Sequence, residues 1–240
     1  MSEAELRDLT LAVPGGEDVK ASLVVPRDGE PRGGVLFLHW FDPEAPDGNR
    51  TQFLDEAQGL ASDGLISLLP QQVFPWSVHP SDSMSDSARI EAELAGLAAC
   101  LGVLEARGAR RMVVVGHDFG AMHGALLMAR DQRIGAGVLI APANRWGDWF
   151  LRFWPIAEDR IDYLRTMQPL DPIEHVAAIA PRPLLLQFAE NDFFIAGMDA
   201  NELYNAAVEP KRIERYDCDH AMRHEQARAD RREFILAALA

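Results

Sequence analysis

One short stretch limits the fold of this chain more than any other: an apolar run followed by a glycine-flanked turn and a helical pattern. The apolar residues 112–115, three of them β-branched valines, lead into residues 116–120, which read Gly-His-Asp-Phe-Gly, and residues 121–130 favour a helix. A strand, a sharp turn and a helix in direct succession need small residues on both sides of the turn, where helix and strand approach closely. Such a turn strains its central residue and lifts that side chain above the end of the sheet. The sequence therefore predicts that Asp118 stands above a strand's carboxyl end.

Strand and helix patterns alternate along most of the chain. Residues 6–13 and 19–25 alternate apolar and polar side chains around Pro14-Gly15-Gly16, which predicts an antiparallel hairpin at a sheet edge. Further strands are expected at residues 34–39, 65–69, 112–115, 138–140, 183–188 and 212–216, with helices at 50–62, 85–107, 198–208 and 221–239. This alternation predicts an α/β fold with a mostly parallel sheet and helices on both faces. Without a visible linker or repeat, one domain spanning residues 1–240 is expected.

Residues 142–175 interrupt the alternation after the sixth strand and are too long for a tight loop. They are rich in aromatic residues, namely Trp146, Trp149, Phe150, Phe153, Trp154 and Tyr163. We expect a small, mostly helical, cap-like insertion packed over the site, with an apolar pocket for a small-molecule substrate that has an apolar part. The same apolar surface is also compatible with a homodimer contact.

Composition excludes some classes of partner. The net charge of −14 argues against nucleic acid and anionic membranes, since both need a basic footprint. The acidic start of the chain has no signal-peptide pattern, and no apolar run approaches the roughly 20 residues of a membrane span. Two cysteines, Cys100 and Cys218, do not make a disulfide framework. We therefore expect a cytoplasmic protein with reduced thiols.

Two polar residues at later strand ends complete the pattern begun by Asp118. Asp192 follows the strand expected at residues 183–188, and His220 follows the strand expected at 212–216. Nucleophile, acid and base in this chain order form a known catalytic arrangement, in which a carboxylate holds one histidine nitrogen while the other faces the nucleophile. The sequence thus predicts a catalytic set of Asp118, Asp192 and His220. Other carboxylates that could hold the histidine remain open, namely Glu190, Asp217 and Asp219.

The glycine-flanked turn at residues 116–120, the elbow, carries no conventional acyl-transfer nucleophile. Most enzymes with such a turn have Ser or Cys at its centre, whereas this chain has Asp118, and Cys100 lies inside an expected helix. Serine or cysteine acyl transfer is therefore disfavoured. His117 and His123 flank the elbow, and we expect them to pack or to form hydrogen bonds there rather than to act in catalysis.

The order and placement of these residues resemble the α/β-hydrolase superfamily, from about Gly33 to the end of the chain. The overall plan and the tail from Asp192 to His220 look most like the dienelactone-hydrolase-like branch. The motif Gly116-His117-Asp118 instead resembles the corresponding motif of haloalkane and haloacetate dehalogenases and epoxide hydrolases. Those families use the elbow carboxylate to attack carbon, which implies the same role for Asp118.

The resemblance also implies where an oxyanion and a leaving group would bind. One oxyanion donor would be the backbone N–H of Trp40 or Phe41, after the strand at residues 34–39, and the other that of Phe119. Indole N–H groups could hold a halide, and tryptophans are plentiful: Trp40, Trp76, Trp146, Trp149 and Trp154. An epoxide would need tyrosines above the site, and the insertion holds only Tyr163.

Three hypotheses about function follow, of which the first two are hydrolases and the third belongs to a different class. The leading hypothesis is displacement by Asp118 at a saturated carbon, giving an ester intermediate that His220-activated water hydrolyses. The second is a dienelactone-hydrolase-like esterase or lactonase in which Asp118 acts as general base toward water. The third is a protein that keeps the fold but binds a ligand without turnover. The displacement mechanism requires no metal or organic cofactor, and no convincing motif for one is visible.

Overall fold

The computed structural model describes residues 4–13, 16–27, 29–42, 44–45 and 47–240. Within this described part, eight strands form one sheet in the order β1-β2-β4-β3-β5-β6-β7-β8. The first pairings, β1 with β2 and β2 with β4, are antiparallel, and the remaining neighbours are parallel. The strands are β1 (Glu5–Leu11), β2 (Val19–Val25), β3 (Gly33–Leu38), β4 (Leu65–Pro70), β5 (Met112–His117), β6 (Ile134–Ile140), β7 (Leu184–Ala189) and β8 (Lys211–Tyr216).

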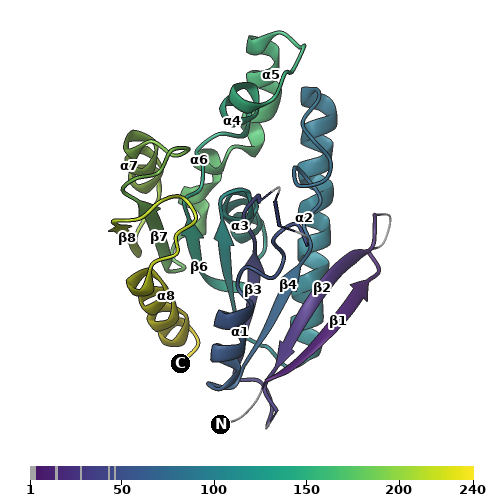
Figure 1. Ribbon diagram of the computed structural model, residues 1–240, viewed down its shortest axis with the longest axis vertical. Helices are drawn as coiled ribbons and strands as arrows, with labels where there is room; N and C mark the ends of the chain where they lie inside the picture. The colour runs from purple at the N-terminus through teal and green to yellow at the C-terminus, as the bar shows by residue number, and fades with distance from the viewer. Residues whose placement is uncertain (1–3, 14–15, 28, 43, 46) are drawn as a thin grey trace.

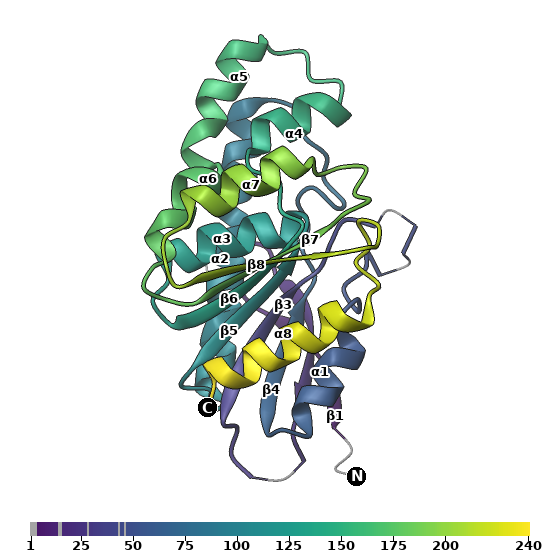
Figure 2. The same cartoon turned by 90° about the vertical axis from the view of Figure 1, so that its left-hand side faces the viewer.

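Helices cover both faces of the sheet, as Figures 1 and 2 show. One face packs against α1 and α8 through a core that includes Phe53, Leu60 and Ile235. The other face packs against α2, α3 and α7 through a larger core. The helices are α1 (Leu54–Ala61), α2 (Ser83–Ala106), α3 (Phe119–Arg130), α4 (Trp146–Phe153), α5 (Arg160–Met167), α6 (Pro172–His175), α7 (Gly197–Ala206) and α8 (Glu225–Ala238), with short 3-10 turns at Gln168–Leu170 and Val176–Ile179.

The central strands are buried along their whole length and mostly apolar because helices cover both of their faces. Every residue of β3, β4, β5 and β7 is buried, as expected for parallel strands between two helical layers. The predicted mostly parallel sheet is therefore confirmed. The carboxyl ends of its parallel strands point to one edge, and loops at that edge carry Asp118, Asp192 and His220.

The insertion after the sixth strand is confirmed as a small helical layer. It contains α4, α5 and α6, and Figure 2 shows α4 and α5 at the end of the molecule beyond the sheet. Two contacts fasten it to α2: the Tyr163 hydroxyl donates to Asp86 at 2.6 Å, and Glu158 accepts from the backbone and hydroxyl of Ser83 at 2.7 Å. These buried and half-buried hydrogen bonds hold the insertion above the elbow.

Two helices begin later than the sequence pattern predicts. Helix α1 starts at Leu54 rather than at residue 50, because the Asp47 carboxylate binds the backbone and hydroxyl of Thr51 and holds that segment in turns. Helix α8 starts at Glu225 rather than at residue 221, since Met222 adopts a left-handed conformation with φ of 51°. The hairpin is confirmed, although two residues of its turn, Pro14 and Gly15, lie outside the described residues.

No helix in the described part of the chain is both long enough and apolar enough to cross a membrane.

Candidate active site

Asp118 occupies a strained turn between the end of β5 and the start of α3. Its φ of 54° and ψ of −120° lie outside the regions that non-glycine residues prefer. A side chain at Gly116 would collide with the backbone of Gly120, and one at Gly120 would collide with the carbonyl of Leu38. Only glycine therefore permits this close approach of α3 to β5 and β3, and the strain projects Asp118 from the sheet end as predicted.

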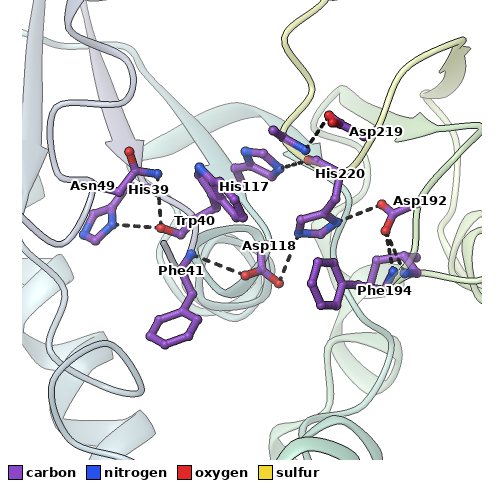
Figure 3. Close-up of polar contacts among 12 residues, drawn as sticks. His39, Trp40, Phe41, Asn49, His117, Asp118, Asp192, Phe194, Asp219 and His220 are labelled. Carbon is purple, nitrogen blue, oxygen red and sulfur yellow. Dashed lines mark hydrogen bonds and ion pairs between the residues drawn. The ribbon is translucent and has the colours of Figure 1, made fainter. Parts of the chain in front are cut away.

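His220 lies between two carboxylates, one from each side of the site (Figure 3). Its Nδ1 donates to Oδ2 of Asp192 at 2.8 Å, and its Nε2 lies 3.8 Å from Oδ1 of Asp118. The other Asp192 oxygen accepts the backbone N–H groups of Phe194 and Ile195 at 2.8 and 2.9 Å. The acid is thus fixed by three hydrogen bonds, and it aims the free histidine nitrogen at Asp118.

The other carboxylates that the sequence left open do not occupy this position. Glu190 is exposed, Asp217 accepts from the Asn191 side chain at 2.8 Å, and Asp219 accepts from the backbone of Ala221 at 3.2 Å. Among the four candidates, Asp192 is the one whose carboxylate accepts from the ring of His220.

The two backbone amides after β3 that the sequence predicts as possible oxyanion donors, those of Trp40 and Phe41, have different hydrogen-bond partners in the structure. The Phe41 N–H points at Oδ2 of Asp118 at 3.4 Å, and the Phe119 N–H also stabilises this carboxylate. The Trp40 N–H instead donates to the side-chain oxygen of Gln52 at 2.9 Å. Phe41 and Phe119 are therefore the amides that face the elbow carboxylate, and Trp40 donates elsewhere.

Burial sets the charge state of the pair formed by Asp118 and His220. It raises the pKa of Asp118 to about 6, against the opposing effects of the His220 charge and the N–H groups of Phe41 and Phe119. Burial alone would lower the pKa of His220, but the hydrogen bond to Asp192 and the charges of Asp118 and Asp192 outweigh it and raise the pKa. A buried carboxylate with a raised pKa beside a histidine is a frequent feature of active sites.

Aromatic rings surround the reacting groups. The Phe194 ring lies 4.9 Å from the His220 ring, and Phe41 and Phe119 meet edge to face at 6.1 Å. Trp154 lies 6.2 Å from both Phe41 and Phe119, and Trp149 lies 5.7 Å from Phe119. The site predicted beneath an aromatic insertion therefore has apolar walls contributed by that insertion and by the loops after β3 and β7.

The candidate tryptophans differ in what their indole N–H groups contact. The indole N–H of Trp76 donates to the backbone oxygen of Trp40 at 3.1 Å. Trp146 is fully buried and stacks on Phe119 at 5.8 Å, and its indole N–H has no hydrogen-bond partner among the described residues. Trp149 and Trp154 both border Phe119, and no hydrogen bond of their indole groups occurs among the described residues.

Sequence reasoning missed two residues of the site. Gln52 forms hydrogen bonds with both Trp40 and His117. Nothing in the surrounding sequence distinguishes it from an exposed glutamine at the start of a helix. Phe194 fixes Asp192 with its backbone and contacts His220 with its ring. A signal was available for Phe194, since two phenylalanines directly after a candidate acid are unusual in a polar loop.

Comparison with known proteins finds esterases. The chain is 26% identical to esterase EstD of Thermotoga maritima over 206 residues, which cover 84% of this chain and 46% of the esterase. It thus spans about half the length of that curated relative. No family model matches the chain.

Solved structures with a similar fold cover almost the whole chain. Est1E from Butyrivibrio proteoclasticus has a TM-score of 0.73 at 14% identity, covering 97% of this chain and 98% of the other. An esterase domain from a Rhodothermus marinus protein has a TM-score of 0.70 at 18% identity, covering 97% of each chain. A Klebsiella pneumoniae protein assigned as a dienelactone hydrolase has a TM-score of 0.69 at 17% identity, covering 98% of each. Together with the sheet order and the elbow, these similarities show that the chain has the α/β-hydrolase fold.

Proposed function

We propose that this chain is a hydrolase in which Asp118 attacks a substrate carbon and forms an ester that His220-activated water then cleaves. The observation that carries this proposal is the state of the two Asp118 oxygens. Oδ2 faces the Phe41 N–H, whereas Oδ1 is buried, faces His220 and has no hydrogen-bond partner among the residues that the structure describes. A buried carboxylate oxygen without a partner is unfavourable in a folded protein, and a role as attacking atom accounts for it.

The chemistry of a carboxylate selects the kind of carbon that is attacked. Attack on an ester carbonyl would give an anhydride, which readily returns to the starting materials. Displacement at a saturated carbon gives an alkyl ester: Oδ1 of Asp118 supplies the electron pair of the new C–O bond, and the leaving group departs with the electrons of the broken bond. A carbon–halogen bond or an epoxide is therefore the substrate bond that suits this elbow.

Formation of the ester would also convert His220 into a base. The negative charge of Asp118 helps to raise the pKa of His220, and that charge disappears when the carboxylate is esterified. The neutral histidine then takes a proton from water as the water oxygen attacks Cγ of Asp118. The Phe41 and Phe119 N–H groups stabilise the oxyanion at Oδ2, and the proton passes from His220 to the departing alkoxide.

The walls of the site favour a neutral, apolar substrate with a halide leaving group. Trp149 and Trp154 supply indole groups next to Phe119, where they can donate to a departing halide. An epoxide oxygen would need an acid, yet the Tyr163 hydroxyl donates to Asp86 and the Tyr216 hydroxyl to Asp230. The remaining tyrosine, Tyr204 on α7, has the ammonium group of Lys211 4.2 Å from the centre of its ring.

A single turnover in water labelled with oxygen-18 tests the proposal. Because water attacks Cγ of Asp118, one labelled oxygen should remain in the carboxylate after the first turnover, while the product alcohol carries the original Oδ1. Mass spectrometry of the peptide that contains Asp118 would detect a gain of one heavy oxygen. Label found in the product, with none in that peptide, would contradict nucleophilic attack by Asp118.

An esterase or lactonase with Asp118 as general base is the second candidate. It is supported by the similarity of 84% of this chain to part of an esterase. In that reaction water attacks the substrate carbonyl directly, so solvent oxygen enters the product acid. The same labelling experiment therefore separates the two candidates.

The rate should fall in acid as Asp118 takes up a proton. Its pKa of about 6 implies that kcat/KM rises with pH up to about that value and then levels off, since only the ionised carboxylate attacks. The midpoint belongs to the coupled pair of Asp118 and His220. A pH–rate profile from pH 4.5 to 8, with circular dichroism to verify folding at each point, measures it. A flat profile across the folded range would contradict the role of Asp118.

A further inference from the structure

Two loops that are far apart in the sequence must be aligned around Asp118. The loop after β3 brings the Phe41 N–H to one carboxylate oxygen at 3.4 Å, and the loop after β8 brings His220 Nε2 to the other at 3.8 Å. Both separations are longer than a well-formed hydrogen bond. The direct contacts to Asp118 are therefore too weak to set the relative position of oxyanion donor and base.

A chain of shorter hydrogen bonds connects the same two loops behind Asp118. The Trp40 N–H donates to Oε1 of Gln52 at 2.9 Å, and Nε2 of Gln52 lies 2.7 Å from Nδ1 of His117. Nε2 of His117 lies 2.8 Å from the backbone oxygen of His220. Figure 3 shows His117 reaching the His220 backbone from the strand that ends at the elbow.

The partners at the two ends fix the direction of every hydrogen bond in this chain. The Trp40 amide can only donate, so Gln52 presents its oxygen to Trp40 and its NH₂ to His117. The His220 carbonyl can only accept, so His117 carries its proton on Nε2 and accepts from Gln52 with Nδ1. This arrangement requires one neutral tautomer of His117 and satisfies both ring nitrogens.

The surroundings of His117 keep it neutral. Its ring is fully buried, which holds its pKa well below the ordinary value, and the nearby charges of His220 and Arg231 act in the same direction. The ring centroids of His117 and His220 are 5.3 Å apart, and Trp40 stacks on His117 at 5.6 Å. A neutral donor–acceptor can hold the His220 loop without placing a second positive charge beside it.

We infer that Gln52 and His117 act as a positioning pair that fixes the position of the Phe41 amide relative to His220 around Asp118. The inference rests on the proposed function of Asp118 and His220. Neither side chain touches the reacting atoms. Gln52 acts on the loop after β3, which carries the Phe41 amide, through its hydrogen bond with Trp40, and His117 acts on the base through the His220 carbonyl. A histidine next to the elbow thus serves both strand packing and alignment of the base.

The choice of substitution matters because a polar cavity of about 120 Å³ borders Gln52 and His117. Water from this cavity could replace a truncated side chain, so alanine would test the pair poorly. We therefore choose leucine, which fills most of the space and cannot form hydrogen bonds, at each position and at both. His117→Gln is the conservative variant, since it keeps an N–H near the position of Nε2.

Gln187→Leu is the matched control. Gln187 is a fully buried glutamine on β7 that donates to Tyr216 and the Ala227 carbonyl and accepts from Arg231. Its replacement leaves Arg231 held by Glu56, which accepts from the guanidinium at 2.7 and 3.1 Å. The variant should lose stability as Gln52→Leu does, since each substitution leaves buried polar groups without partners. Its activity per folded molecule should stay unchanged.

Activity of folded enzyme gives the first readout. In Gln52→Leu and in His117→Leu, kcat should fall about 10- to 100-fold with KM nearly constant, because misplacement by about 1 Å has effects of this size. The double variant should be no worse than the single variants, and His117→Gln should recover most of the loss. Equal losses in Gln187→Leu, or additive losses in the double variant, would overturn the inference.

Nitrogen-15 NMR of the histidine rings gives a second readout that needs no substrate. We expect His117 to remain a neutral Nε2–H tautomer from pH 5 to 8, and the titration midpoint of His220 to move in Gln52→Leu but not in Gln187→Leu. A Nδ1–H tautomer, or an unmoved midpoint, would overturn the positioning pair even if the enzyme were active. Conversely, if the protein hydrolyses none of the substrates tested but the NMR results are as expected, only the proposed function is contradicted.

Discussion

His220→Gln should stop the reaction at a covalent ester on Asp118. Formation of the ester needs the carboxylate, whereas its cleavage needs a base to take a proton from water, and glutamine cannot do this. Glutamine still offers an N–H to Asp192, which His220 contacts at 2.8 Å. We expect turnover to fall by about 10⁴- to 10⁶-fold, as for removal of a triad member, while one equivalent of substrate becomes attached.

Intact-mass spectrometry with small pools of haloalkanes, haloacids, epoxides and esters measures this trapping. The mass gain identifies the substrate class, and peptide mapping should place it on Asp118. The double variant Asp118→Asn/His220→Gln is the control and should gain no mass. If the unsubstituted protein hydrolyses an ester in these pools and His220→Gln accumulates nothing, Asp118 is a base rather than a nucleophile.

The parts of the site that could be predicted are those encoded by short sequence segments. The elbow at residues 116–120 combines a strand, two glycines and a helix, so its local geometry places Asp118. Asp192 and His220 follow their strands directly, and parallel strands bring their carboxyl ends to one edge. The positions of these three residues relative to their strands were therefore enough to predict that their side chains lie close together.

The parts that could not be predicted depend on contacts between distant segments. The choice of Phe41 over Trp40 as the amide facing Asp118 is made by Gln52, whose oxygen accepts the Trp40 N–H. Likewise, the sequence does not distinguish Trp76 from Trp149 and Trp154, yet the Trp76 indole N–H donates to the backbone oxygen of Trp40. Composition and periodicity carry no information about such pairings.

Asp118→Asn should abolish turnover and yet make the folded protein more stable. An amide oxygen is a far weaker nucleophile than a carboxylate, so we expect a loss of at least about 10³-fold. Such a loss also separates an enzyme from a fold that merely binds a ligand. The ionised Asp118 is unfavourable in the folded state, because burial raises its pKa from 3.8 to about 6. This shift corresponds to about 3 kcal/mol at neutral pH.

The pH dependence of stability determines whether Asp118→Asn raises or lowers the free energy of unfolding. Between about pH 4 and pH 6 the folded state binds more protons at Asp118 than the unfolded state does, so the free energy of unfolding falls as pH rises. The substituted protein lacks this penalty. Its gain in stability should be about 1–3 kcal/mol at pH 7 and should vanish near pH 4, as measured by urea unfolding at both pH values.

Asp192→Asn is the matched control, because the same change at the acid should have the opposite effect on stability. The Asp192 carboxylate accepts three hydrogen bonds, from His220, Phe194 and Ile195, so its replacement weakens interactions that the folded state uses. Both variants should lose activity, but only Asp118→Asn should gain stability. If Asp118→Asn were less stable at pH 7, the carboxylate would be a structural group. A gain would mean that the protein retains an unfavourable buried charge at this position because its chemistry requires one.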